Sequence, residues 1–163
     1  MKVRNIAVMI LLSTMSWLSS AQESELLEKA VKTLQVVEFA DTVKFTYGYL
    51  CAENDIDSDL AELCGKMDKV PNEVYYTVVA PYFAQYVTSE EMDIVLNFWQ
   101  SEEGKALNAK LNYAMETGDA SALTEEDFLL SENMEPEGLT KFIDTEEIQM
   151  QVNRALLKAI LAY

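Results

Sequence analysis

The stretch FAQYVTSEEMDIVLNFWQSEEGKAL, residues 83–107, carries the strongest helix-start signals in this sequence. Its segment Thr88-Ser89-Glu90-Glu91 has the pattern of a capping box. In that motif the threonine hydroxyl and the glutamate carboxylate each accept the other residue's backbone N–H. Apolar residues then recur at steps of three and four, which predicts one buried helical face. Its members are Met92, Val95, Leu96 and Trp99.

A second helix is predicted directly after the first. Ser101 is a suitable N-cap residue, and Gly104 would let the two helices approach closely. Because the stretch also combines carboxylates with aromatics, Glu103 near Trp99 and Glu91 near Tyr86 are candidates for a catalytic acid. Helix capping or solvent exposure is the interpretation that the spacing favours for both carboxylates.

The rest of the chain shows helical spacing almost throughout, with too few glycines and prolines for a many-stranded β fold. We therefore predict a single all-α domain of five to seven helices. Pro81 is expected to kink or divide its helix, because it lacks a backbone donor. The expected helical ranges are 24–50, 59–67, 75–86, 89–100, 101–117, 125–131 and 145 onward.

The first 21 residues have the features of a secretory signal peptide. Lys2 and Arg4 precede an apolar run from Ile6 to Leu18. The small residues that a cleavage site requires follow at 19–21, so cleavage is expected after Ala21. The alternative is a retained anchor, but the run is shorter than the ~20 residues that a membrane-spanning helix needs. We predict a signal peptide over 1–21, an all-α domain over 22–163, export to the periplasm or outside the cell, and no stable membrane insertion after cleavage.

Composition argues against several classes of function. The net charge of −16 disfavours binding to nucleic acid through electrostatic repulsion. The absence of histidine excludes Ser-His-Asp and Cys-His catalysis and removes the commonest metal ligand. With only two cysteines, a zinc site is not expected. There is no nucleotide-binding motif, and no cofactor is predicted.

Cys51 and Cys64 are the two cysteines, and an even pair in an exported protein predicts a disulfide. Two buried free thiols are the alternative. Residues 55–66, which include Cys64, resemble a calcium-binding loop, with Asp55, Asp57 and Asp59 at its first, third and fifth positions. The positions that require glycine and a bidentate glutamate hold Leu60 and Lys66, so an acidic connection between helices is favoured.

The opening stretch, extended back to Pro81, resembles an uncharacterised family of exported bacterial helical domains, catalogued as domain of unknown function twenty fifty-nine. The residues that match its pattern in register are Pro81, Phe83, Thr88, Glu90, Glu91, Met92, Phe98, Trp99, Ser101, Gly104 and Leu107. The chain departs from the pattern at Val87, where an aromatic is usual, and at Glu102, where proline is usual. The resemblance covers residues 81–107 and implies an exported helical fold without an assigned activity.

These observations favour a non-enzymatic module that binds an unidentified protein or takes part in envelope interactions. Two alternatives stay open: a carboxylate-based hydrolase acting on cell-wall material, and a carrier of a small apolar ligand. A cleft with two convergent carboxylates would favour the hydrolase. A sizeable apolar cavity beside Tyr82 and Trp99 would favour the carrier.

Overall fold

The structure is a computed structural model that describes residues 22–52 and 58–163. The expected signal peptide and two of the acids in the calcium-like segment, Asp55 and Asp57, lie outside the described residues. Within the described ranges all regular structure is helical, which confirms the predicted fold class. The helices are 22–36, α2 (Phe39–Cys51), α3 (Ser58–Met67), α4 (Asn72–Tyr86), α5 (Ser89–Gln100), α6 (Glu102–Thr117), α7 (Glu125–Asn133), α8 (Glu137–Asp144) and α9 (Glu146–Ala162).

The expected helix over 24–50 is in fact two helices, so this part of the prediction is wrong. The chain breaks at Glu38, which adopts a left-handed conformation with φ 51°. The Glu38 carboxylate accepts hydrogen bonds from the side-chain amides of Asn108 at 3.0 Å and Asn112 at 2.9 Å. These partners come from α6, about 70 residues further along the chain. The break is therefore tied to a long-range contact that local periodicity does not report.

The second unpredicted element is α8, which raises the described helices to nine and exceeds the expected five to seven. It follows Pro136, whose backbone is extended (φ −65°, ψ 157°). With eight residues, α8 spans about two turns, too few for a helical period to stand out in an acidic segment. It nevertheless buries Gly138 and Phe142.

Of the two outcomes expected at Pro81, a kink or a division, the division does not occur, because α4 runs without interruption from Asn72 to Tyr86. A proline removes only one backbone donor. The face of α4 that carries Tyr75, Val79 and Phe83 is buried, and this burial holds the helix together.

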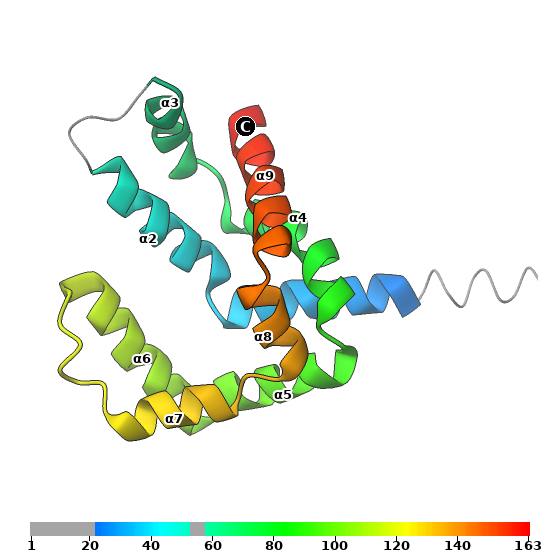
Figure 1. Ribbon diagram of the computed structural model, residues 1–163, viewed down its shortest axis with the longest axis vertical. Coiled ribbons are helices and arrows are strands. Elements are labelled where there is room, and N and C mark those ends of the chain that lie inside the picture. The colour runs from blue at the N-terminus through cyan, green and yellow to red at the C-terminus, as the bar shows by residue number, and fades with distance from the viewer. Residues whose placement is uncertain (1–21, 53–57) are drawn as a thin grey trace, which may run out of the picture.

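The core forms around α4, which packs against α2, α8 and α9 (Figure 1). α9 contributes a regular apolar face to it, as its spacing predicts. The buried members of that face are Ile148, Val152, Leu156 and Ile160. α5 and α6 pack against each other and continue into α7, on the side of the molecule where α8 begins (Figure 1).

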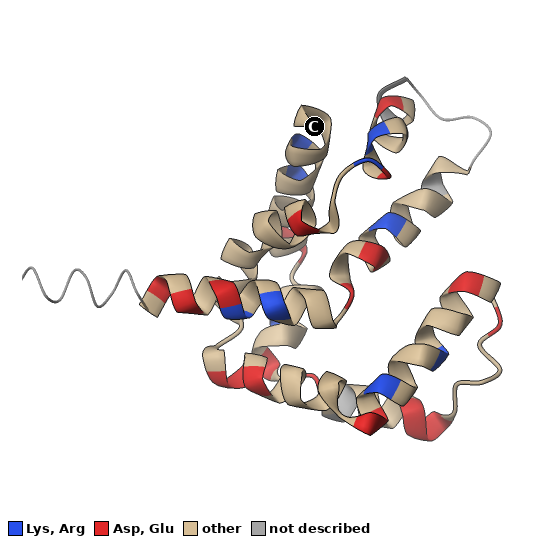
Figure 2. Ribbon diagram, turned by 180° about the vertical axis from the view of Figure 1, so that it is seen from behind, with Lys and Arg blue, Asp and Glu red and all other residues tan. Residues whose placement is uncertain are grey.

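Cys51 and Cys64 form a disulfide between the end of α2 and α3, with a Cα–Cα distance of 5.9 Å. The predicted pairing is thus confirmed. Among the described residues, no helix combines the length and the apolar character needed to cross a membrane. The chain has 28 Asp and Glu against 12 Lys and Arg, and Figure 2 shows where the described ones lie along the helices.

Candidate functional site

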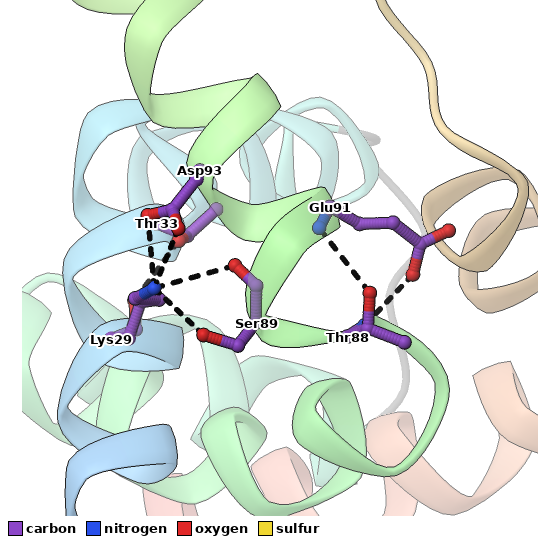
Figure 3. Close-up of polar contacts among 6 residues, drawn as sticks. All are labelled: Lys29, Thr33, Thr88, Ser89, Glu91 and Asp93. Atoms are coloured by element: carbon purple, nitrogen blue, oxygen red, sulfur yellow. Dashed lines mark hydrogen bonds and ion pairs between the residues drawn. The ribbon is translucent and has the colours of Figure 1, made fainter.

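The capping box predicted at Thr88 is present and fixes the start of α5 (Figure 3). The Thr88 N–H donates to Glu91 Oε2 at 2.8 Å, and the Glu91 N–H donates to Thr88 Oγ1 at 3.3 Å. Beside it, Lys29 of the first helix donates to Ser89 Oγ at 2.7 Å and pairs with Asp93 at 2.9 Å. These contacts dock the first helix onto the beginning of α5.

Glu91 also accepts the backbone N–H of Gly138 at 2.8 Å, which links α5 to α8. The hydrogen bonds from the Thr88 and Gly138 backbone lower the pKa of the Glu91 carboxyl. A general acid at neutral pH needs the opposite shift. Glu103, the other candidate for a catalytic acid, is exposed in the first turn of α6. The carboxylates therefore give no support to a hydrolytic site in this stretch.

The turn into α6 is built as the sequence predicts. The Gly104 N–H donates to Ser101 Oγ at 3.1 Å, which makes Ser101 the N-cap. A Cβ atom at Gly104 would clash with the carbonyl group of Phe98 and lie 2.8 Å from the Trp99 Cα. Gly104 is thus required for the close approach of the two helices.

Trp99 is only half-buried, so its assignment to the fully buried face is wrong. Phe98 is buried instead, together with Met92, Val95 and Leu96. The two aromatic rings meet edge to face, with centroids 5.1 Å apart and an interplanar angle of 70°. The buried face of α5 is therefore rotated relative to the predicted one, and Trp99 lies at the wall of a cavity.

That cavity has a volume of about 380 Å³, and most of its lining is apolar. It lies among the first helix, α2, α4, α5, the end of α7, α8 and the start of α9. Its volume is within the range of about 300–1,000 Å³ that is usual for small-molecule sites. The lining residues are Leu34, Val37, Phe39, Thr42, Phe83, Trp99, Ser131, Met134, Glu135, Leu139, Phe142, Ile143 and Gln149.

The inner wall of the cavity is rigid. Phe83 of α4 and Phe142 of α8 are both buried, and their rings pack edge to face with centroids 5.2 Å apart. Such aromatic pairs add about 0.5–1.5 kcal/mol beyond their buried area. Ile143, the next residue of α8, also lines the cavity and is 48 % exposed, so this part of the lining is accessible to solvent. A fixed inner wall and an accessible side are features of a preformed ligand site.

The sequence prediction located only part of this site. It singled out Phe83 and Trp99, but it assigned both to the core. The wall that α8 forms was not predicted, because α8 itself was not predicted. The residues at the break near Glu38 were predicted to lie inside a single helix. Tyr82, expected beside the same cavity, lines a separate hollow between α4 and α9 with Ala155 and Lys158.

The calcium alternative for residues 55–66 is not supported. α3 begins at Ser58, so the positions from Asp59 onward form a helix and not a ligand loop. Among the described residues, no group of three or more Cys, Asp and Glu side chains is arranged to hold a metal ion.

Comparison with known proteins gives no match: no protein-family model, curated protein or solved structure is significantly similar to this chain.

Proposed function

We propose that this chain is a non-enzymatic binding module that carries a small apolar molecule in the cavity beside Trp99. The observation that carries the proposal is a cavity of about 380 Å³ with a mostly apolar lining. Transfer of apolar surface from water into such a site is favourable by about 25 cal/mol per Å².

Two features support this function over the hydrolase. The carboxylates whose pKa moves among the described residues, Glu91, Asp119 and Asp127, all have it lowered. Each is held by hydrogen bonds from neighbouring groups, which favour the charged form. The cavity itself contains a single carboxylate, that of Glu135, whereas hydrolysis by the glycosidase route uses two.

The proposed function includes export of the protein. The basic and apolar leader supports it. The disulfide between Cys51 and Cys64 also supports it, because such bonds persist in oxidising compartments. Membership of the family that residues 81–107 resemble stays a prediction. The capping box, the Ser101 cap and the close approach at Gly104 give its matched residues structural roles.

The binding test uses Trp99 as its reporter. In the full chain with Trp17→Phe, Trp99 is the only tryptophan. A neutral medium-chain bromoalkanol, whose bromine quenches an indole on contact, is titrated into this protein. We expect saturable quenching of the Trp99 fluorescence. A linear, unsaturable decrease equal to that of free tryptophan would overturn the proposal.

A matched pair of variants assigns the binding to the cavity. Ile143→Glu places a charge in the apolar lining, whereas Ile94→Glu makes the same change on α5, outside the lining. The two isoleucines are 48 % and 49 % exposed, so both variants should fold. We expect Ile143→Glu to weaken binding about tenfold or more, the effect of placing a charge against an apolar ligand. Ile94→Glu should bind as the parent does, and equal losses would exclude the cavity.

A further inference from the structure

The cavity has few hydrogen-bond donors to offer a ligand. Its three neutral polar side chains already donate to backbone carbonyl groups. Thr42 Oγ1 donates to Glu38 at 3.3 Å, and Ser131 Oγ donates to Phe128 at 2.9 Å. The side-chain amide of Gln149 donates to the Phe142 carbonyl at 2.7 Å. An anionic head group would therefore find the hydroxyl donors of Thr42 and Ser131 occupied, together with one of the two N–H donors of Gln149.

The nearby start of α8 already has a carboxylate bound to it. The first turn of a helix normally exposes N–H groups that attract anions. Here the Gly138 N–H donates to the Glu91 carboxylate at 2.8 Å. A negative charge is thus already placed at this helix end.

Glu135 is the only charged residue of the lining. It is exposed, and among the described residues it forms no ion pair with a lysine or arginine. Its position is restricted by the chain on both sides. The Met134 N–H donates to the Ser131 carbonyl at 3.1 Å, and Pro136 disfavours a helical conformation at the residue before it. These restraints act on the backbone, and they keep Glu135 in the lining of a mostly apolar cavity.

We infer that the ligand is a cationic amphiphile, with its apolar part in the cavity and its positive head group beside Glu135. This inference rests on the proposed function, since it requires that the cavity binds an apolar molecule. The net charge of −16 acts in the same direction by attracting cations and repelling anions at long range. A fatty-acid-like anion would meet one carboxylate and no lining cation.

The test compares three probes of equal chain length in the Trp17→Phe protein at low salt: a bromoalkylammonium, a bromoalkanol and a bromoalkanoate. Each reports through quenching of Trp99, so binding elsewhere on the acidic surface is not registered. We expect the ammonium to bind about threefold tighter than the alkanol, and the alkanoate about threefold weaker, as for a solvent-exposed charge pair.

Two neutralising variants separate Glu135 from the general field of the protein. Glu135→Gln should bring the affinities for the ammonium and the alkanol together. Glu90→Gln removes the same charge from the first turn of α5, outside the lining, and should preserve the preference. Equal affinities in the parent, or equal loss of preference in both variants, would overturn the inference while the alkanol still binds. Failure of all three probes to bind would overturn the proposed function and the inference with it.

Discussion

Glu91 Oε1 accepts the backbone N–H of Gly138 at 2.8 Å, although the two residues lie 47 positions apart in the chain. The other oxygen of the same carboxylate accepts the Thr88 N–H. A helix-capping side chain therefore also joins α5 to α8, which forms one wall of the cavity. A motif that is local in the sequence has acquired a tertiary role.

Glu91→Gln should lower the free energy of unfolding at neutral pH by about 1–2 kcal/mol, since it weakens a helix cap and a charged hydrogen bond. Thermal unfolding measures this change. The neighbouring variant Glu90→Gln, on an exposed side chain, is the control and should stay within about 0.5 kcal/mol of the parent. Similar losses in both would show that the Gly138 contact contributes nothing.

The same carboxylate gives a pH dependence with a defined sign. Folding lowers the pKa of Glu91 from its ordinary value of 4.5, so the charged form stabilises the protein above that pH. This stabilisation is lost as the pH falls through the lower, folded-state pKa. The difference in melting temperature between the parent and Glu91→Gln should therefore narrow below about pH 4.5. A constant difference down to strong acid would contradict the assignment.

Gly104→Ala should destabilise the protein by about 1–3 kcal/mol, in the range of overpacking substitutions. The added Cβ would meet backbone atoms of Phe98 and Trp99, which cannot rotate away as a side chain can. Gly48→Ala is the matched control in α2, where a Cβ would have no atom within 4 Å. It should stabilise the helix by about 0.5–1 kcal/mol. Chemical denaturation of the two variants should give changes of opposite sign.

Lys110 and Asp127 anchor α7, which ends at the cavity rim. The hydrogen bond from the Lys110 ammonium, with those from Thr124, lowers the pKa of Asp127 from 3.8 to about 2. The charged anchor is therefore complete above pH 3.8 and is lost as the pH falls toward about 2. A titration followed by NMR at the Asp127 carboxyl carbon should show this midpoint.

Lys110→Met should move the Asp127 midpoint upward, toward its ordinary value. Asp119 is the internal control, because its pKa is lowered by hydrogen bonds from Ser121 and not by a lysine. Its midpoint should not change in the variant. An unchanged Asp127 midpoint would show that Lys110 does not hold α7 in place.

Reduction of the Cys51–Cys64 bond should destabilise the protein by about 3 kcal/mol in the chain-entropy account, given the separation of 13 residues. The melting temperature with and without reductant measures this loss. The double variant Cys51→Ser/Cys64→Ser should start at the lower value and be insensitive to reductant. A reductant-insensitive parent would contradict the bond.

Phe83→Ala should cost about 3–5 kcal/mol, because the side chain is 1 % exposed and packs against Phe142. Trp99→Ala should cost about half as much, since Trp99 is only half-buried. This difference departs from the expectation from sequence, in which Phe83 and Trp99 are both core residues. Equal losses of stability would restore that expectation.

Prediction from sequence succeeded where the signal was local. The capping box needs only residues three apart, and the Ser101 cap needs only the next turn. The disulfide follows from the number of cysteines and the expected compartment. Prediction from sequence failed for α8, whose eight residues are too few to show a helical period. It also failed for the buried face of α5, where Phe98 and Trp99 are adjacent apolar residues.

The sequence by itself determined the helical class and the helix starts at Thr88 and Ser101, because backbone propensities and short-range hydrogen bonds act within a few residues. It also determined the pairing of the cysteines, because there are only two. Only the tertiary structure decided the break at Glu38, the half-buried position of Trp99 and the existence of the cavity. These depend on contacts between distant segments, such as Glu38 with Asn108 and Asn112. A cavity is the space that several helices leave between them, so no single helix encodes it.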